Sequence, residues 1–263
     1  MVKIGLDAGH GLKTSGKRTP DGIHEWELND KVRDYVVKLL KNYDVTFVFT
    51  DNNEGAKDES LSSRKKTYIN KDVDAFVSIH HNAHLGKWGS ANGVEIYVDK
   101  NNTSADMKLA NAIYKNLPKY TGLKSRGVNK ANWTVINQNS VPAVLVEGGF
   151  MDNKKDHKVI TSDEGQLAYA KAVADGLISF LGLKKKANTK DKDSDKSFVV
   201  RVLVKELNIR SNAGAEYKKV DSIKDRGLYT IVDTKKAKDG GTWGKLKSNA
   251  GWINISPKYV DRI

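Results

Sequence analysis

Short apolar runs alternate with longer amphipathic stretches along the first two thirds of the chain. The short runs are rich in β-branched and aromatic residues, and they predict strands at 2–7, 45–50, 74–82, 93–98 and 142–147. The longer stretches repeat apolar residues every three or four positions, and they predict helices at 25–42, 60–70, 104–117 and 163–181. This alternation predicts an α/β domain over residues 1–182, with a mostly parallel twisted sheet and helices on both faces.

The last third of the chain follows a different pattern. Between residues 198 and 263, short apolar runs are separated by turn residues at 199–204, 207–211, 219–224, 228–235, 242–247 and 251–255. Six short strands in so short a segment predict a small all-β barrel. The intervening residues 183–197 are almost entirely polar and carry both signs of charge, which predicts a flexible linker between two domains.

Composition narrows the class of protein. The chain has 263 residues, of which 38% are hydrophobic and 29% charged, which is typical of a folded protein. It contains no cysteine, so disulfides and thiolate chemistry are excluded. No run approaches the roughly 18 apolar residues of a membrane span, and the first residues lack the apolar core of a secretion signal. We therefore expect synthesis in the cytoplasm and another route to any external site of action.

Positive charge is concentrated near the C-terminal end. The formal net charge is +13, and residues 197–263 contribute +7 of it. This distribution predicts attraction to a polyanion, although a solvated basic surface is an equally good interpretation. Because no phosphate-cradling or base-recognition motif accompanies the charge, a nucleic-acid partner is not expected.

Four polar residues stand where the predicted elements begin or end. His10 follows the first strand, His80 lies near the end of the third, Glu147 ends the fifth, and Glu25 starts the first helix. Ligands of open α/β sheets bind beyond the carboxyl ends of the strands, so these side chains are expected to converge there.

Two imidazoles and one carboxylate form a hydrolytic zinc ligand set. Such an ion polarises a carbonyl and lowers the pKa of water, and a second carboxylate is then needed to move the proton. Glu147 suits that catalytic role, beside a Zn²⁺ held by the other three residues. Sequence spacing alone does not separate His80 from His81, and Glu27 is an alternative to Glu25.

The segments "LDAGHG", "GIHEWELN", "FVSIHHNA", "GVEIY" and "PAVLVEGGFMDN" occur in that order. Over residues 1–181 they resemble the motifs of zinc-dependent N-acetylmuramoyl-L-alanine amidases of the amidase-3 family. The resemblance implies that His10, Glu25 and His80 bind zinc and that Glu147 is catalytic. The implied reaction is hydrolysis of the amide between muramic acid and the first L-alanine of the peptidoglycan stem peptide.

Several residues near these motifs have more than one possible role. Asn82 and Arg126, the latter in a predicted loop at 123–133, are expected to contact substrate, with a chain turn and a solvated charge as the alternatives. Arg64 is expected to form a structural salt bridge, and Glu95, inside a predicted strand, is structural or supports the site.

The C-terminal segments "LNIRSNAG" and "TWGKLKSNAGWINISPKYV" resemble bacterial SH3-type cell-wall-binding domains. The resemblance implies that residues 198–263 bind a wall peptide or an anionic wall polymer. An aromatic groove is expected from Tyr217, Trp243, Trp252 and Tyr259, the alternative being that the two tryptophans belong to the core.

Taken together, these features predict a peptidoglycan hydrolase that lyses cell walls, as a phage endolysin or a bacterial autolysin does. A zinc exopeptidase of similar topology and a non-catalytic wall-binding protein are the alternatives. We expect peptidoglycan as the partner, and neither a membrane span nor nucleic acid.

Overall fold

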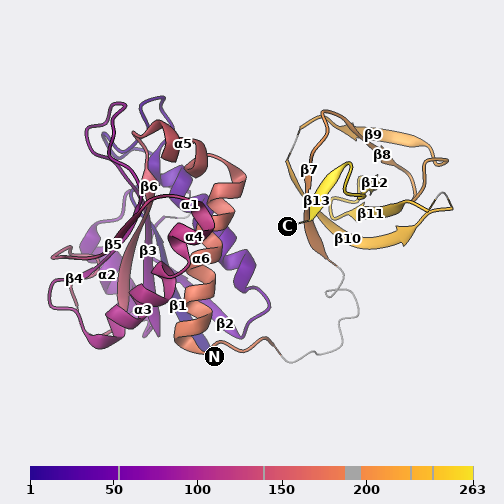
Figure 1. The fold of residues 1–263 in the computed structure, drawn as a ribbon. Helices are drawn as coiled ribbons and strands as arrows, with labels where there is room; N and C mark the ends of the chain where they lie inside the picture. Colours follow the sequence, from indigo (N-terminus) through magenta and orange to yellow (C-terminus); the bar gives the residue numbers. More distant parts are fainter. Residues whose placement is uncertain (53, 139, 187–196, 226, 239, 263) are drawn as a thin grey trace. The chain divides into compact units, whose positions relative to one another are not determined.

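The computed structural model describes residues 1–262 apart from 53, 139, 187–196, 226 and 239. The chain forms two compact units, Met1–Lys186 and Ala187–Ile263 (Figure 1). No described helix has the length and apolar character that crossing a bilayer requires.

The first unit is built on a six-stranded sheet with the order β2-β1-β3-β6-β4-β5. Its strands are β1 (Val2–Ala8), β2 (Val45–Phe49), β3 (Ala75–Asn82), β4 (Val94–Asp99), β5 (Ser125–Ala131) and β6 (Ala143–Phe150). Neighbours pair in parallel, except that β4 runs antiparallel to β6. The sheet is therefore mixed, and β1, β3 and β6 share one direction, so that their carboxyl ends lie at one edge.

Helices cover both faces of this sheet, as the sequence predicted (Figure 1). They are α1 (Glu25–Leu40), α2 (Leu61–Asn70), α3 (Ser104–Tyr114), α4 (Leu117–Thr121), α5 (Lys154–Ile160) and α6 (Asp163–Leu181). On one face, α1, α3 and α6 bury apolar stripes against the sheet, such as Val32, Val36 and Leu40 of α1. On the other face, Tyr68 of α2 packs with Phe76 and with the segment that contains Val135.

Two local predictions were wrong. Arg126 lies in strand β5 and not in a loop. No residue of this edge strand is buried, so its sequence is mostly polar and lacks the apolar alternation that marks a strand with one face in the core. The helix predicted at 104–117 ends at Tyr114, and a separate short helix follows with Pro118 in its first turn. Helix α5 has no counterpart in the sequence prediction.

The second unit is all-β, as predicted. Its strands are β7 (Phe198–Val202), β8 (Leu207–Arg210), β9 (Lys219–Ile223), β10 (Leu228–Lys236), β11 (Thr242–Leu246), β12 (Trp252–Asn254) and β13 (Val260–Arg262). They form one antiparallel sheet in the order β13-β7-β10-β11-β12-β8-β9. The six predicted runs all form strands, and β13 is an additional one.

The predicted linker lies mostly outside the described residues. Residues 187–196 are not described, whereas the residues before them bond to the first unit. The N–H of Lys186 donates to the carbonyl of Asn42, and the carbonyl of Lys184 accepts from the N–H of Asp44. These backbone bonds attach residues 184–186 to the turn between α1 and β2.

Candidate active site

Three of the predicted site residues form a compact cluster at the carboxyl edge of the sheet. His80 Nδ1 lies 3.0 Å from Glu25 Oε1, and His10 Nε2 lies 3.4 Å from Glu25 Oε2. One donor atom from each of the three residues lies within 4.8 Å of the others. The loop after β1, the start of α1 and the end of β3 therefore bring together two imidazoles and one carboxylate.

The backbone around His10 is specialised for this contact. His10 has φ = 68°, a left-handed conformation that is uncommon outside glycine. The preceding Gly9 allows the His80 ring to pack closely, because a Cβ at Gly9 would lie 2.1 Å from that ring. The tight turn "GHG" thus places one histidine beside the other, whose ring centroid is 4.9 Å away.

The structure separates the adjacent alternatives. His81 points away from the cluster, where its Nδ1 lies 2.8 Å from Asn29 Oδ1 and its ring meets Tyr169 edge-on. Glu27 accepts a hydrogen bond from the backbone N–H of His24, as part of a capping box at the start of α1. His80 and Glu25, rather than these neighbours, therefore face His10.

Burial and the charges of neighbouring groups shift the pKa values of the three residues in different directions. Burial lowers the pKa of His10 to about 4, which keeps its imidazole neutral. Burial opposes ionisation of Glu25, but the hydrogen bond and the charge of His80 outweigh it and lower the pKa of Glu25 to about 2. The cluster thus combines a neutral imidazole with a buried, ionised carboxylate.

Glu147 lies beside this cluster. It stands in register with His80 on β3 and with Glu95 on β4. Its side chain is buried, and its Oε2 has no hydrogen-bond partner among the described residues. Burial raises the pKa of Glu147 to about 8. A buried polar atom without a partner is costly, so this oxygen is a candidate contact for a ligand.

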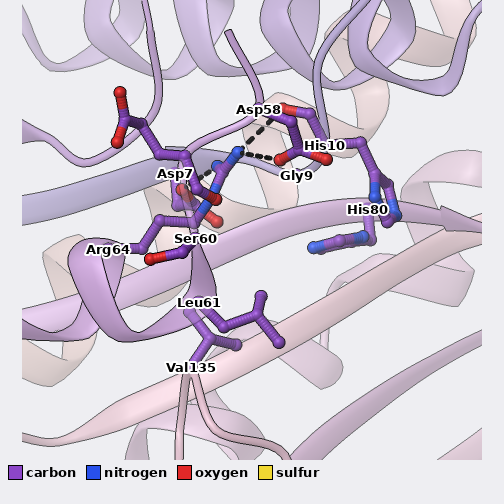
Figure 2. A pocket seen from close by; sticks show the side chains of 10 residues that line it. Asp7, Gly9, His10, Asp58, Ser60, Leu61, Arg64, His80 and Val135 are labelled. Atoms are coloured by element: carbon purple, nitrogen blue, oxygen red, sulfur yellow. Dashed lines mark hydrogen bonds and ion pairs between the residues drawn. The ribbon is translucent and has the colours of Figure 1, made fainter. Parts of the chain in front are cut away.

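A pocket of about 310 Å³ opens beside the two histidines (Figure 2). Leu61 and Val135 form apolar parts of its lining. Arg64 also lines the pocket and is buried, with Nη1 2.6 Å from Asp7 Oδ1 and Nη2 2.8 Å from the carbonyl of His10. Arg64 therefore fixes the turn that carries His10. The pocket combines distant segments, and no local sequence signal marks it.

Asn82 and Arg126 meet at a common partner. The Nδ2 of Asn82 donates to Glu95 Oε1 over 2.7 Å, and Arg126 Nε lies 3.3 Å from the same oxygen. A second amide, from Asn129, donates to Glu95 Oε2 over 2.8 Å. The buried carboxylate of Glu95 thus binds three polar side chains beside Glu147. In the sequence, Glu95 was marked by its place in the motif "GVEIY".

An α/β sheet with two imidazoles, one carboxylate and a further buried carboxyl at its edge is typical of metal-dependent hydrolases. Residues 4–179 match the family model for N-acetylmuramoyl-L-alanine amidase, Amidase_3. The chain belongs to this family, and it is a peptidoglycan amidase that lyses cell walls. The amidase function predicted from sequence is confirmed.

Individual relatives agree with this assignment. The chain is 31% identical over 271 residues to an endolysin of Bacillus phage SPP1, with 98% of this chain and 97% of that protein covered. It is 28% identical over 191 residues to the N-acetylmuramoyl-L-alanine amidase CwlM of Bacillus licheniformis, covering 71% and 72% of the two chains. The catalytic domain of CwlV, an N-acetylmuramoyl-L-alanine amidase from Bacillus (Paenibacillus) polymyxa var. colistinus, matches with a TM-score of 0.63 at 32% identity, covering 70% of this chain and 100% of that domain.

Proposed function

We propose that the chain is a zinc-dependent amidase in which His10, Glu25 and His80 hold the ion. The observation that carries this proposal is the donor cluster itself, with its donor atoms within 4.8 Å and the unpartnered Oε2 of Glu147 beside it. Two imidazole nitrogens and one carboxylate suit zinc and leave a position for further ligands. A zinc ion at this site supplies Lewis acidity toward the amide carbonyl and toward water.

Glu147 moves the proton in this proposal. Its carboxylate accepts a proton from the attacking water and passes it to the departing nitrogen of the amide. The free Oε2 is suited to this exchange, since no described protein group competes for it. A nearby cation lowers the pKa of a buried carboxyl, so a bound ion offsets the burial that raises the pKa of Glu147.

The bond that we propose is cleaved joins muramic acid to the first L-alanine. Product analysis of digested peptidoglycan tests this directly. An intact stem peptide with a new N-terminal alanine supports the proposal, whereas single amino acids clipped from peptide ends support the zinc exopeptidase. A protein that binds the wall without releasing product is a non-catalytic wall-binding protein.

The second unit is proposed to be an SH3-type barrel that attaches the enzyme to the wall. Along β8, β11 and β12, alternate residues such as Ile209, Leu246 and Ile253 enter the main core of this unit. Trp243 and Trp252 instead form a separate cluster with Ala213. Trp252 directly precedes Ile253, and Trp243 lies three residues before Leu246. Residues an odd number of positions apart in a strand point to opposite faces, so the two tryptophans lie on the face opposite the main core.

A pocket of about 170 Å³ on this face supports the binding role. It is lined in part by Asn208, Arg210, Asn254 and Trp243, whose buried Nε1 has no hydrogen-bond partner among the described residues. An unused buried donor in a polar pocket is suited to an acceptor atom of a wall peptide or of an anionic wall polymer. The likeness to the phage endolysin covers both units, which supports an endolysin-like role for the whole chain.

A further inference from the structure

Arg126 is a cation that the fold holds in a defined position. Its Nε lies 3.3 Å from Glu95 Oε1, its Nη1 donates to the carbonyl of Asn92 over 3.3 Å, and its Cζ lies 4.9 Å from the centre of the Phe150 ring. The side chain is nevertheless 35% exposed. An arginine that is already ordered loses little further conformational entropy when it binds a ligand.

This position lies beside the proposed catalytic residue. Glu95, which holds Arg126, stands directly opposite Glu147 in the pairing of β4 with β6. Side chains of such opposed residues are neighbours on one face of a sheet. Phe150, beneath the guanidinium, belongs to the same strand as Glu147. Arg126 is therefore separated from the site of cleavage by a single side chain.

The guanidinium retains hydrogen-bonding capacity for a ligand. It has five N–H donors, and its contacts with described residues engage Nε and Nη1. The remaining donors belong to a partly exposed group and have the planar geometry that recognises carboxylates. The buried carboxyls of Glu25, Glu95 and Glu147 would otherwise make this edge of the sheet unfavourable for an anionic ligand.

The chemistry of the substrate decides which part of it meets this cation. The carboxyl group of muramic acid is consumed in the amide that is cleaved, so the sugar side of that bond carries no carboxylate. All carboxylates belong to the peptide side. The first one after L-alanine is the α-carboxyl of the second residue, a glutamate linked through its side chain, and this group occurs either free or amidated.

We propose that Arg126 binds the free α-carboxylate of the second stem-peptide residue. The stem peptide then extends from Glu147 toward β4 and β5, and the enzyme prefers stems in which this carboxylate is not amidated. The inference rests on the proposed function, because it takes Glu147 as the point of cleavage.

A matched pair of soluble substrates tests the inference. They are N-acetylmuramoyl-L-alanyl-γ-D-glutamyl-L-lysine and the same compound with its glutamyl α-carboxyl amidated. A hydrogen bond to a charged group contributes more binding free energy than one between neutral groups. We therefore expect kcat/KM of the wild-type full chain to be about 10-fold higher for the free acid than for the amidated compound. In Arg126→Gln we expect this ratio to fall to about one. Arg126→Lys keeps the positive charge but lacks the planar guanidinium with its paired donors, so its ratio is expected to be intermediate.

Lys130→Gln is the matched control, since it removes one positive charge from an exposed position on the same strand. This variant keeps the wild-type ratio. A wild-type ratio near one, or the same ratio in Arg126→Gln as in wild type, overturns the inference and leaves the proposed function standing. Failure to release stem peptide from either substrate overturns both.

Discussion

Glu147 and Glu95 stand directly opposite each other in the antiparallel pairing of β6 with β4. Two like-charged groups in this relationship destabilise a sheet unless their surroundings compensate. Glu95 is compensated by two amides and by Arg126, whereas one oxygen of Glu147 has no partner among the described residues. The asymmetry distinguishes a carboxyl that is fully hydrogen-bonded from the one that we propose to act on the substrate.

The role of Glu147 is tested by Glu147→Gln, which keeps the shape of the side chain and removes its ability to accept a proton. We expect kcat on purified peptidoglycan to fall by about 10²- to 10⁴-fold. Zinc content, measured by elemental analysis, stays at the wild-type value because the three proposed ligands are intact. Activity equal to that of wild type would refute the assignment.

The metal site is tested by thermal unfolding with zinc and with a chelator. A ligand present at 100 times its Kd stabilises the folded state by about 2.7 kcal/mol, so we expect zinc to raise the Tm by several degrees. The increase disappears in His80→Ala. It persists in His157→Ala, which removes a histidine that contacts Asp21 and Trp88 outside the cluster. An equal increase in both variants would rule out His80 as a ligand.

The buried pair of Asp7 and Arg64 supports the turn that carries His10. We expect Asp7→Asn to lower the free energy of unfolding at pH 7 by about 3 kcal/mol, because it leaves a buried guanidinium without its closest counter-charge. The exposed Asp44→Asn serves as the control and has little effect. Urea unfolding curves measure both.

The effect of Asp7→Asn depends on pH in a defined direction. Burial opposes ionisation of Asp7, but Arg64 and the hydroxyls of Ser78 and Thr50 outweigh it and lower its pKa. A lowered pKa in the folded state adds stability at pH values above the usual value of 3.8, and this contribution is lost as the pH falls through the folded-state pKa. The gap between wild type and Asp7→Asn should therefore stay constant from pH 7 to about 5 and narrow below 3.8. A gap that widens toward acid would contradict the pairing.

The second unit is tested by Trp243→Phe, which keeps most of the ring and removes the unpartnered N–H. We expect wall binding of the full chain to weaken by about 3- to 10-fold, the value of one hydrogen bond. The folded protein itself should not lose hydrogen-bonding energy, since this donor has no partner among the described residues. Trp88→Phe in the first unit is the control, and sedimentation with purified walls is the measurement. Unchanged binding in Trp243→Phe would place the wall contact elsewhere.

Much of the fold followed from the sequence, because local periodicity reports which side of an element is buried. The apolar stripe of α1 and the strands that end near His10, His80 and Glu147 were predicted from their own residues. Parallel strands bring their carboxyl ends to one edge, so the convergence of these side chains also followed.

Tertiary structure alone decided which neighbouring side chains face the site. Adjacent residues of a strand point to opposite faces, so spacing alone left both His80 and His81 open. The family resemblance favoured His80, and the packing of β3 between β1 and β6 placed the side chain of His80 against Glu25. The reversal of β4 set Glu95 against Glu147, and the polar edge strand β5 brought Arg126 to the same place. These contacts join residues far apart in the chain, and their partners are selected by packing of the whole sheet rather than by any local pattern.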